Sequence, residues 1–419
     1  MAREPATGNS LSAWQVVIGF GVVSLGVDLV ADGARSIAGP LLGQLGASAL
    51  VVALVTGAAE ALGFGLRLFS GPAVDRTRRY WAFSIGGYTL TALCVPLLAI
   101  TPFLGTIGLA VAASLIIVER VGKAIRSPAK TTLLAPAAGA VGRGRGFGVH
   151  KLFDQIGAFG GPLLVAAIVA MTGALWPALA FLALPAIVAL LILLWLRRRV
   201  PDPDAYEPAA AGKVTRTGDA ATDSGASRPA GRLSRNFILF AASTTLTTFG
   251  LVGFGLISFH LTTAGLVPLP TVPLVYALGM AVAAVAAIVT GRLYDRIGPV
   301  VLLVVPVLAA AVPFLSLAPA LPAVLGGVAV WGAATGIQDS TVKALVADLV
   351  PLRRRGGAYG IFAVFQGAGT FAGAAIAGAL YPDAALLGVL VAPAQLVALG
   401  LLVVVVRRHR RRTLTADTI

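Results

Sequence analysis

Charged residues are scarce in this 419-residue chain, where 12% are Asp, Glu, Lys or Arg and 58% are hydrophobic. Soluble domains carry roughly 25% charged residues, so this scarcity argues against a soluble protein and indicates a membrane protein. The single cysteine, Cys94, excludes an internal disulfide, and the three histidines lie too far apart in sequence for metal-ligand spacing. We therefore expect no metal and no other cofactor.

Recognisable catalytic and targeting signals are also lacking. The sequence contains no G-x-x-x-x-G-K-[ST] motif, so direct use of ATP is not expected. No Ser/His/Asp constellation stands out, which leaves an enzyme without residues to carry its chemistry. The N-terminus has no basic region followed by a short apolar core and a cleavage site, so we expect no signal peptide.

What the chain does have is long apolar stretches of about 20 residues, the length that crosses a bilayer. The first six predicted spans lie near 11–34, 47–69, 80–100, 106–126, 147–170 and 176–196. The second six lie near 236–260, 272–290, 299–317, 321–347, 358–380 and 384–406. This pattern predicts an all-α membrane protein with twelve transmembrane helices in two six-helix halves, 1–196 and 236–406.

The net charge of +15 is distributed unevenly between the loops. The six loops on the predicted outer side contain no Lys or Arg, and only Arg35 lies near an outer end. Basic loops stay in the cytoplasm, so both termini are predicted there, in a cell membrane. Residues 197–235, rich in Ala, Gly, Pro and Ser, predict a flexible cytoplasmic linker, and 407–419 a basic cytoplasmic tail. We expect a monomer in the lipid bilayer and no nucleic acid partner.

Two charge motifs repeat at one fixed distance, which indicates two equivalent halves. The first motif and its copy, 220 positions later, are Gly71, Asp75 and Arg76 with Gly291, Asp295 and Arg296. The second motif and its copy, at the same distance, are Glu119 and Lys123 with Asp339 and Lys343. In the fifth helix the offset is 212, which aligns Gly157 and Gly161 with Gly369 and Gly373. Halves of six spans run in the same direction, so their axis lies along the membrane normal.

The loop between the second and third spans reads Gly71-Pro-Ala-Val-Asp75-Arg76-Thr-Arg78-Arg79. It resembles the G-x-L-x-D-R-x-G-R-R loop of the major facilitator superfamily, with Ala73 in place of Leu and Arg78 in place of the second Gly. The copy keeps Gly291, Asp295, Arg296 and Gly298 but loses the final basic pair.

The resemblance covers nearly the whole chain and implies a transporter whose two halves rock about a central cavity. It also implies that the loop residues Gly71, Asp75, Arg76 and Arg79, with the copy, act as a latch on the inner gate. Gly71 would permit a tight turn. The alternative is a topology anchor, in which the basic residues only retain the loop in the cytoplasm.

Charges inside the predicted spans are the candidate substrate or proton sites. Each central charge costs roughly 2.5–3.5 kcal/mol to insert, so these groups must face protein, water or one another. The candidates are Asp28, Asp32, Glu60, Glu119, Arg120, Lys123, Arg126, Asp154, Gln155, Asp339 and Lys343. Each is either part of a static ion pair or a site that binds substrate or exchanges a proton.

Local spacing separates these candidates. A Lys follows Glu119 and Asp339 by one helical turn, which favours static pairs there. Glu60 has no such partner within four residues, which leaves both alternatives open. The duplicated pairs are expected to serve architecture and gating, whereas Glu60, Arg120 and Asp154 have no charged counterpart in the second half. We expect the transport chemistry at these unshared charges.

The predicted fifth helix contains Gly157-Ala-Phe-Gly-Gly161-Pro162. Small residues four apart allow helices to pack closely, and Pro162 weakens the helix where a hinge is useful. This G-x-x-x-G-P run resembles the helix-5 motif of drug–proton exporters of the same superfamily. His150, near the start of this helix, is expected at the inner boundary.

Together these features predict a secondary active transporter that moves a small solute by alternating access, with protons as the coupling ion and export as the leading direction. Proton-linked uptake of a metabolite is the first alternative, since the motifs do not give the direction. A membrane receptor or scaffold that transports nothing is the alternative from another class.

Overall fold

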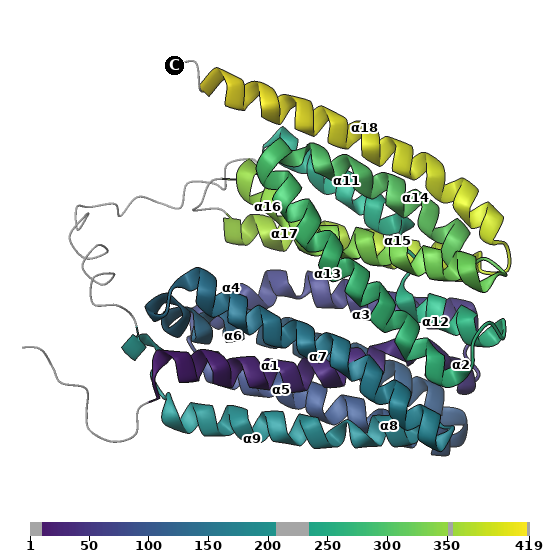
Figure 1. Ribbon diagram of the computed structural model, residues 1–419, viewed down its shortest axis with the longest axis horizontal. Helices are drawn as coiled ribbons and strands as arrows, with labels where there is room; N and C mark the ends of the chain where they lie inside the picture. Colours follow the sequence, from purple (N-terminus) through teal and green to yellow (C-terminus); the bar gives the residue numbers. More distant parts are fainter. Residues whose placement is uncertain (1–10, 207–233, 351–354, 417–419) are drawn as a thin grey trace, which may run out of the picture.

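The computed structural model describes residues 11–206, 234–350 and 355–416, and within these ranges the chain forms helices and no strands (Figure 1). Eleven continuous helical runs in the described ranges are long and apolar enough to cross a membrane. One of them, Leu269–Ser316, covers two of the predicted spans, 272–290 and 299–317, and the 3₁₀ segment Gly298–Leu303 lies where the second begins. The predicted all-α architecture of twelve spans in two halves is therefore confirmed.

The helices of each half follow one another along the chain. The first half consists of α1 (Ala13–Ser36), α2 (Ala38–Gln44), α3 (Ala49–Gly65), α4 (Arg67–Thr77), α5 (Tyr80–Leu97), η1 (Leu98–Phe103), η2 (Gly105–Ile107), α6 (Gly108–Ala140), α7 (Arg143–Thr172), α8 (Leu175–Phe181) and α9 (Ala183–Arg199). The second half consists of α11 (Arg235–Gly250), α12 (Phe254–Thr263), η4 (Leu269–Thr271), α13 (Val272–Ile297), η5 (Gly298–Leu303), α14 (Val304–Ser316), α15 (Leu321–Asp339), α16 (Thr341–Leu349), α17 (Arg355–Ala379) and α18 (Ala384–Ala416). In Figure 1 most of the second half lies above the first, and the two halves meet where α17 packs against α3 and α12 against α2.

Side-chain caps mark the starts of some helices. Ser12 caps α1 in a capping box with Gln15, and Ser48 accepts a hydrogen bond from the backbone N–H of Val51 at the start of α3. The hydropathy pattern predicts a fourth span that ends at 126, but α6 continues to Ala140. The hydropathy of α6 falls near Arg126 and Lys130, but the helix continues. Both charges are paired within the protein, with Asp28 and Asp154 respectively.

The predicted linker and the predicted tail both overlap observed helices. The predicted linker 197–235 begins with the last turn of α9 and a short 3₁₀ helix, η3 (Pro203–Tyr206), and its central part, 207–233, lies outside the described residues. The predicted tail 407–419 is not separate from the last span, because α18 runs on to Ala416.

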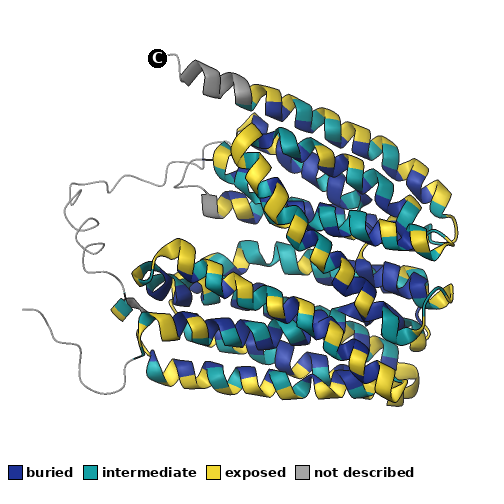
Figure 2. Cartoon of the chain, in the orientation of Figure 1, coloured by how far each residue is buried: buried dark blue, intermediate teal, exposed yellow. Residues whose placement is uncertain are grey.

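Many large apolar residues are exposed on the bundle. Figure 2 shows exposed residues along the outer faces of the helices. Leu191 is 60% exposed, Val285 62% and Leu396 69%. A soluble monomer rarely presents so much continuous apolar surface to water. The exposed surface is therefore one that faces lipid.

The fifth helix of the first half packs against the first helix through its glycines. A side chain at Gly157 or Gly161 in α7 would overlap the backbone carbonyls of Leu25 and Leu29 in α1, respectively. Only glycine lets the two backbones approach this closely. Pro162 follows directly and is buried within α7.

The second half repeats the same contact. In α17, side chains at Gly369 and Gly373 would overlap the carbonyls of Thr245 and Phe249 in α11. These glycines lie 212 positions after those of α7, and the carbonyls lie 220 positions after those of α1. The duplication visible in the sequence is thus a duplication of packing.

The two ends of the bundle differ in how the halves meet. We call the end that carries Arg76, Arg79 and Arg197 the basic end. At this end each half has its own apolar core, one around Phe20 and one around Phe240. At the opposite end, one continuous core draws residues from both halves.

Helices α2 and α12 form the tightest part of that shared core. A Cβ atom at Gly39 in α2 would overlap backbone atoms of Gly255 and Phe259 in α12. Figure 1 shows α2 and α12 side by side at the end away from the chain's linker. The structure is therefore closed at the opposite end, while at the basic end the halves keep separate cores.

Candidate functional site

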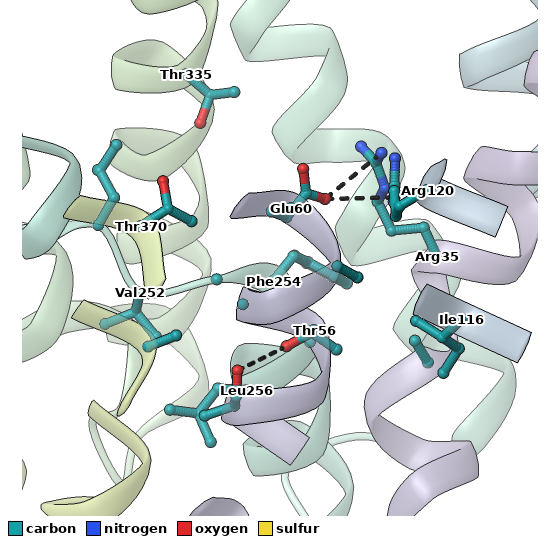
Figure 3. Close-up of a pocket in the computed structure, with 18 of the residues that line it drawn as sticks. Arg35, Thr56, Glu60, Ile116, Arg120, Val252, Phe254, Leu256, Thr335 and Thr370 are labelled. Atoms are coloured by element: carbon teal, nitrogen blue, oxygen red, sulfur yellow. Dashed lines mark hydrogen bonds and ion pairs between the residues drawn. The ribbon is translucent and has the colours of Figure 1, made fainter. Parts of the chain in front are cut away.

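A cavity of about 230 Å³ lies between the two halves (Figure 3). The first half contributes α1, α3 and α6 to its wall, and the second half contributes α12, α13, α15 and α17. Such sites between repeats are where transporters of duplicated build bind their substrates. The cavity is small relative to drug-sized pockets of about 300–1,000 Å³.

Glu60 is the centre of the charged wall. Its Oε1 atom lies 3.5 Å from Nη2 of Arg35 and 3.3 Å from Nη2 of Arg120, so arginines from α1 and α6 meet on one carboxylate oxygen of α3 (Figure 3). The side chain of Glu60 is 36% exposed, whereas that of Arg120 is 8% exposed. Glu60 is therefore the part of this group that solvent can reach.

The charged wall continues on both sides of Glu60. Arg120 Nε lies 3.4 Å from Glu119 Oε2, and Arg35 Nη1 lies 3.3 Å from Asp32 Oδ1. In a low-dielectric interior an unpaired charge is costly, and this alternation of signs offsets that cost. The sequence-predicted charges of three helices are thus brought together in one network.

A second pair extends the network away from the cavity. Thr91 in α5 donates a hydrogen bond to Glu119 and accepts one from Arg126 at 2.9 Å. Arg126 Nη2 lies 3.4 Å from Asp28 Oδ1, and the guanidinium sits 4.8 Å from the centre of the Tyr88 ring. Of the two alternatives given for Asp28, an ion pair or a substrate or proton site, the structure shows an ion pair with a buried arginine within the first half.

The second half presents a different wall. Phe254, Tyr276 and Trp331 line the cavity, and the Phe254 and Tyr276 rings are T-shaped with centroids 4.7 Å apart. Trp331 lies 5.5 Å from Phe254. Figure 3 shows Thr335 and Thr370 on the side of Glu60 away from Arg35 and Arg120. One wall is charged, and the other is aromatic with a few hydroxyls and one carboxylate, that of Asp339, which is paired with Lys343.

Two polar groups of the cavity wall have no hydrogen-bond partner among the described residues. They are Nε of Arg35 and the amide nitrogen of Gln338, whose residue is 7% exposed. Buried polar groups are normally hydrogen-bonded, so unpaired ones at a cavity mark places where a ligand or water is bound.

A separate polar cluster lies in the first half. Asp154 in α7 is approached by Lys130 at 3.6 Å, His150 at 3.5 Å and Lys151 at 3.9 Å. Lys130 also donates a hydrogen bond to Ser24 at 3.1 Å. His150 is 5% exposed, so it is buried within this cluster, while Gln155 beside it is partly exposed.

The two duplicated pairs behave differently. Lys343 Nζ lies 3.0 Å from Asp339 Oδ1, and the side chain of Asp339 is 63% exposed. The equivalent pair is absent, since Lys123 forms no ion pair with Glu119 in the described part of the chain and Arg120 takes its place. The repeated spacing therefore corresponds to a repeated pair in the second half only.

The loop motif is helical where a turn was expected. Gly71 lies inside α4 with open space around it, and Gly291 lies inside α13. The chain instead turns at Arg78 (φ 52°) and at Gly298 (φ 71°). These two positions are 220 apart, so the tight turn belongs to the second glycine of the motif, which Arg78 replaces. The expectation that Gly71 makes the turn is wrong because α4 continues through it.

The charged residues of the loop motif lie at the basic end. Asp75, Arg76 and Arg79 are exposed, as are Asp295 and Arg296 of the copy. None of the five has an ion pair with another described residue at this end. The structure thus places both copies where the halves keep separate cores.

Several residues of the site gave no signal in the sequence. The aromatic wall, Gln338, Thr91 and Lys130 were not singled out, although they line the cavity or bind the predicted charges. Aromatic and hydroxyl side chains are common in every membrane helix, so nothing distinguishes those that face a cavity. Lys130 lies beyond the predicted end of its span.

Comparison with known proteins adds to this geometry. A sequence profile described as "Major Facilitator Superfamily" matches residues 18–374. Proteins of Mycobacterium tuberculosis and Mycobacterium bovis, both described as uncharacterised, are 47% identical over 384 residues, covering 91% of this chain and 90% of theirs.

Solved transporter structures share the fold at low sequence identity. Nucleoside transporter NupG matches with a TM-score of 0.69 at 12% identity, over 93% of this chain and 99% of its own. Peptide transporter POT in complex with sulfate gives 0.70 at 13% identity, over 98% and 97%. A D-xylose-proton symporter gives 0.63 at 14% identity, over 91% and 96%. The family and these neighbours are transporters, and the chain belongs to the major facilitator superfamily.

Proposed function

We propose that this protein is a proton-coupled secondary active transporter of a small solute, working as a monomer in the cytoplasmic membrane with both termini inside. The observation that carries this proposal is Glu60. It is a partly exposed carboxylate in the cavity between the halves, and two arginines from different helices bind one of its oxygens. A carboxylate in a low-dielectric cavity can be charged or protonated, which is what coupling to protons requires.

Alternating access follows from the unequal ends of the bundle. The halves 1–196 and 236–406 act as two bodies joined by the linker 197–235, with 407–419 as a basic extension. With the basic end in the cytoplasm, the state described here faces inward, since the shared core lies at the other end. Rocking of the halves would break that core and bring the basic ends together.

The exposed loop residues fit the role of a latch in this cycle. Asp75 and Arg76 are exposed while the basic end has separate cores. On closure of that end they would meet the second half and hold it, as the family resemblance implies. Asp295 and Arg296 would act in the same way from the other side.

Export is the direction that we propose, supported by the Gly157-x-x-x-Gly161-Pro162 run and its contact with α1. Uptake coupled to protons is the second candidate, and the similarity to a D-xylose-proton symporter favours it. Overexpression gives resistance to a toxic solute if the protein exports it, and growth on a nutrient if it imports one.

The test is flux in proteoliposomes with an imposed proton gradient, using a solute found by thermal-shift screening of the purified protein. Replacing Glu60, Glu119 and Asp154 singly with the amide should abolish proton-driven flux in at least one variant, with Glu60→Gln expected to lose it. Unchanged flux in all three would show that these carboxylates do not couple transport to protons. No flux of any solute, with a fixed protein partner that co-purifies, would favour a receptor or scaffold.

A further inference from the structure

The arginines of the cavity are incompletely bonded. Arg35 and Arg120 lie 3.3–3.5 Å from their carboxylate partners, longer than the 2.7–2.9 Å usual for charge-assisted hydrogen bonds. Nε of Arg35 has no partner among the described residues. A guanidinium has five N–H groups and binds a carboxylate best through two of them at once. The site therefore holds donors that a ligand with acceptor oxygens would satisfy.

Glu60 occupies the place that such a ligand would take. Both arginines contact its Oε1 alone, and its side chain is the most exposed of those in the charged wall. Asp32 and Glu119 are held from other sides, by Tyr276 and by Thr91. Of the three carboxylates, Glu60 is the one that can leave the arginines without breaking another contact.

The opposite wall selects the rest of the ligand. Phe254, Tyr276 and Trp331 form a continuous aromatic surface beside the charged wall, within a cavity of about 230 Å³. Tyr276 joins the two walls through its hydrogen bond to Asp32, and Trp331 is the partly exposed ring of the three. Aromatic faces stack on planar apolar groups. Gln338 adds an unpaired amide group at the same wall. A small molecule with a carboxylate at one end and a ring at the other matches both walls.

We propose that the substrates are small aromatic carboxylates, whose carboxylate displaces that of Glu60 from Arg35 and Arg120, so that Glu60 takes up a proton. This inference rests on the proposed function, because it assigns the substrate class and coupling step of the same site. Since substrate and proton bind together, it favours the second candidate direction, proton-linked uptake, over export. The charge is balanced: one carboxylate replaces another at the arginines, and the proton that neutralises Glu60 comes from solvent through the cavity. Binding without the proton would add an uncompensated negative charge, which a low-dielectric site disfavours.

The experiment measures binding and proton uptake on purified protein in detergent. Benzoate and 1-naphthoate are the probes, with benzyl alcohol and benzylammonium as matched neutral and cationic molecules and acetate as the carboxylate without a ring. We expect saturable binding of the aromatic carboxylates only, with a Kd on the order of 1 mM or tighter. About one proton should be taken up for each carboxylate bound, measured with an indicator dye in weak buffer.

Variants separate the roles of the charged wall. Glu60→Gln should bind benzoate at least as tightly as the parent, since its competitor is gone, but should take up no proton. Arg120→Gln should weaken binding by at least about tenfold. Arg67→Gln is the matched control, because Arg67 lies in the neighbouring α4 but does not line the cavity. Thermal unfolding shows whether each variant is folded. If Arg120→Gln is not folded, binding and proton uptake by Glu60→Gln alone test the inference.

The possible results distinguish failure of this inference from failure of the proposed function. Preferential binding of benzylammonium, no saturable binding of either aromatic carboxylate, or binding by the parent without proton uptake each overturns the inference. If vesicles couple a proton gradient to some other solute while the carboxylates do not bind, the inference fails and the proposed function stands. If the carboxylates bind with proton uptake but vesicles show no flux, the proposed function fails instead.

Discussion

The hydroxyl of Tyr276 donates a hydrogen bond of 2.9 Å to Asp32 across the boundary between the two halves. Tyr276 has no exposed surface, and Asp32 is 4% exposed. Arg35 Nη1 lies 3.5 Å from the same hydroxyl and 3.3 Å from Asp32. The charged network of the first half is thus tied to the aromatic wall of the second half at one buried point. Opening of the opposite end has to break this bond.

Replacing Tyr276 with Phe should shift the protein toward states that are open at the opposite end. The change removes a hydrogen bond to a charged acceptor, worth about 1.5–3 kcal/mol, from the closed state only. Spin labels at Gln44 and Thr263, both exposed at that end, would report a longer distance in a larger fraction of molecules. The single cysteine, Cys94, is replaced with Ala beforehand.

The matched control is Tyr381→Phe, which removes a tyrosine hydroxyl bonded to His260 within the second half. It should leave the distance distribution unchanged, because both partners move together. Equal shifts in the two variants would mean that the bond between the halves has no special role in closure.

Asp28→Asn should destabilise the first half by about 2–3 kcal/mol, because it leaves the buried Arg126 without a carboxylate. The additional change Arg126→Gln should recover part of this loss, since it removes the unpaired charge. Unfolding of the purified variants in detergent measures both effects. Additive losses in the double variant would show that the two groups do not interact.

The fold could be predicted because hydropathy and the bilayer constrain it so strongly. A transmembrane span needs about 20 apolar residues, so the apolar stretches of that length in the sequence fix where the spans lie. Where a helix becomes less apolar, as α6 does beyond Arg126, hydropathy no longer predicts its full length. The repeat predicted the duplicated packing of Gly157 and Gly369, because backbone contacts depend on residue size alone.

The site was predicted only in part, for a related reason. Glu60 and Arg120 stood out because a charge in an apolar helix is costly and needs an explanation. Their partners could not be predicted, since the pairing of Glu60 with Arg35 depends on how separate helices are rotated. The spacing within one helix predicted a partner for Glu119 at Lys123, but the structure places Arg120 there. Arg120 lies in the same helix as Glu119, and contacts from neighbouring helices accompany this pairing, from Thr91 to Glu119 and from Glu60 to Arg120.

Gly161→Ala should destabilise the protein by about 1–3 kcal/mol, since the added methyl group would overlap the carbonyl of Leu29 and push α7 from α1. The adjacent Gly160→Ala is the control, because nothing lies within 4 Å of a Cβ there. Gly373→Ala in the second half should repeat the loss. Thermal unfolding that is equal for Gly160→Ala and Gly161→Ala would contradict the packing described here.

Arg78→Gly should stabilise the protein by about 0.5–1 kcal/mol, because Arg78 is the one described residue other than glycine with a positive φ. In this left-handed conformation a residue with a Cβ atom is less stable than glycine. The equivalent position in the second half already holds Gly298. Gly298→Ala should cost about 1–3 kcal/mol, because the backbone of Gly298 (φ 71°, ψ −157°) lies in a region that essentially only glycine adopts. Arg79→Gly is the control, since Arg79 has φ −88° and gains nothing from glycine. Thermal unfolding in detergent ranks the variants, and a lower melting temperature for Arg78→Gly than for the parent would show that the side chain of Arg78 contributes more than its backbone costs.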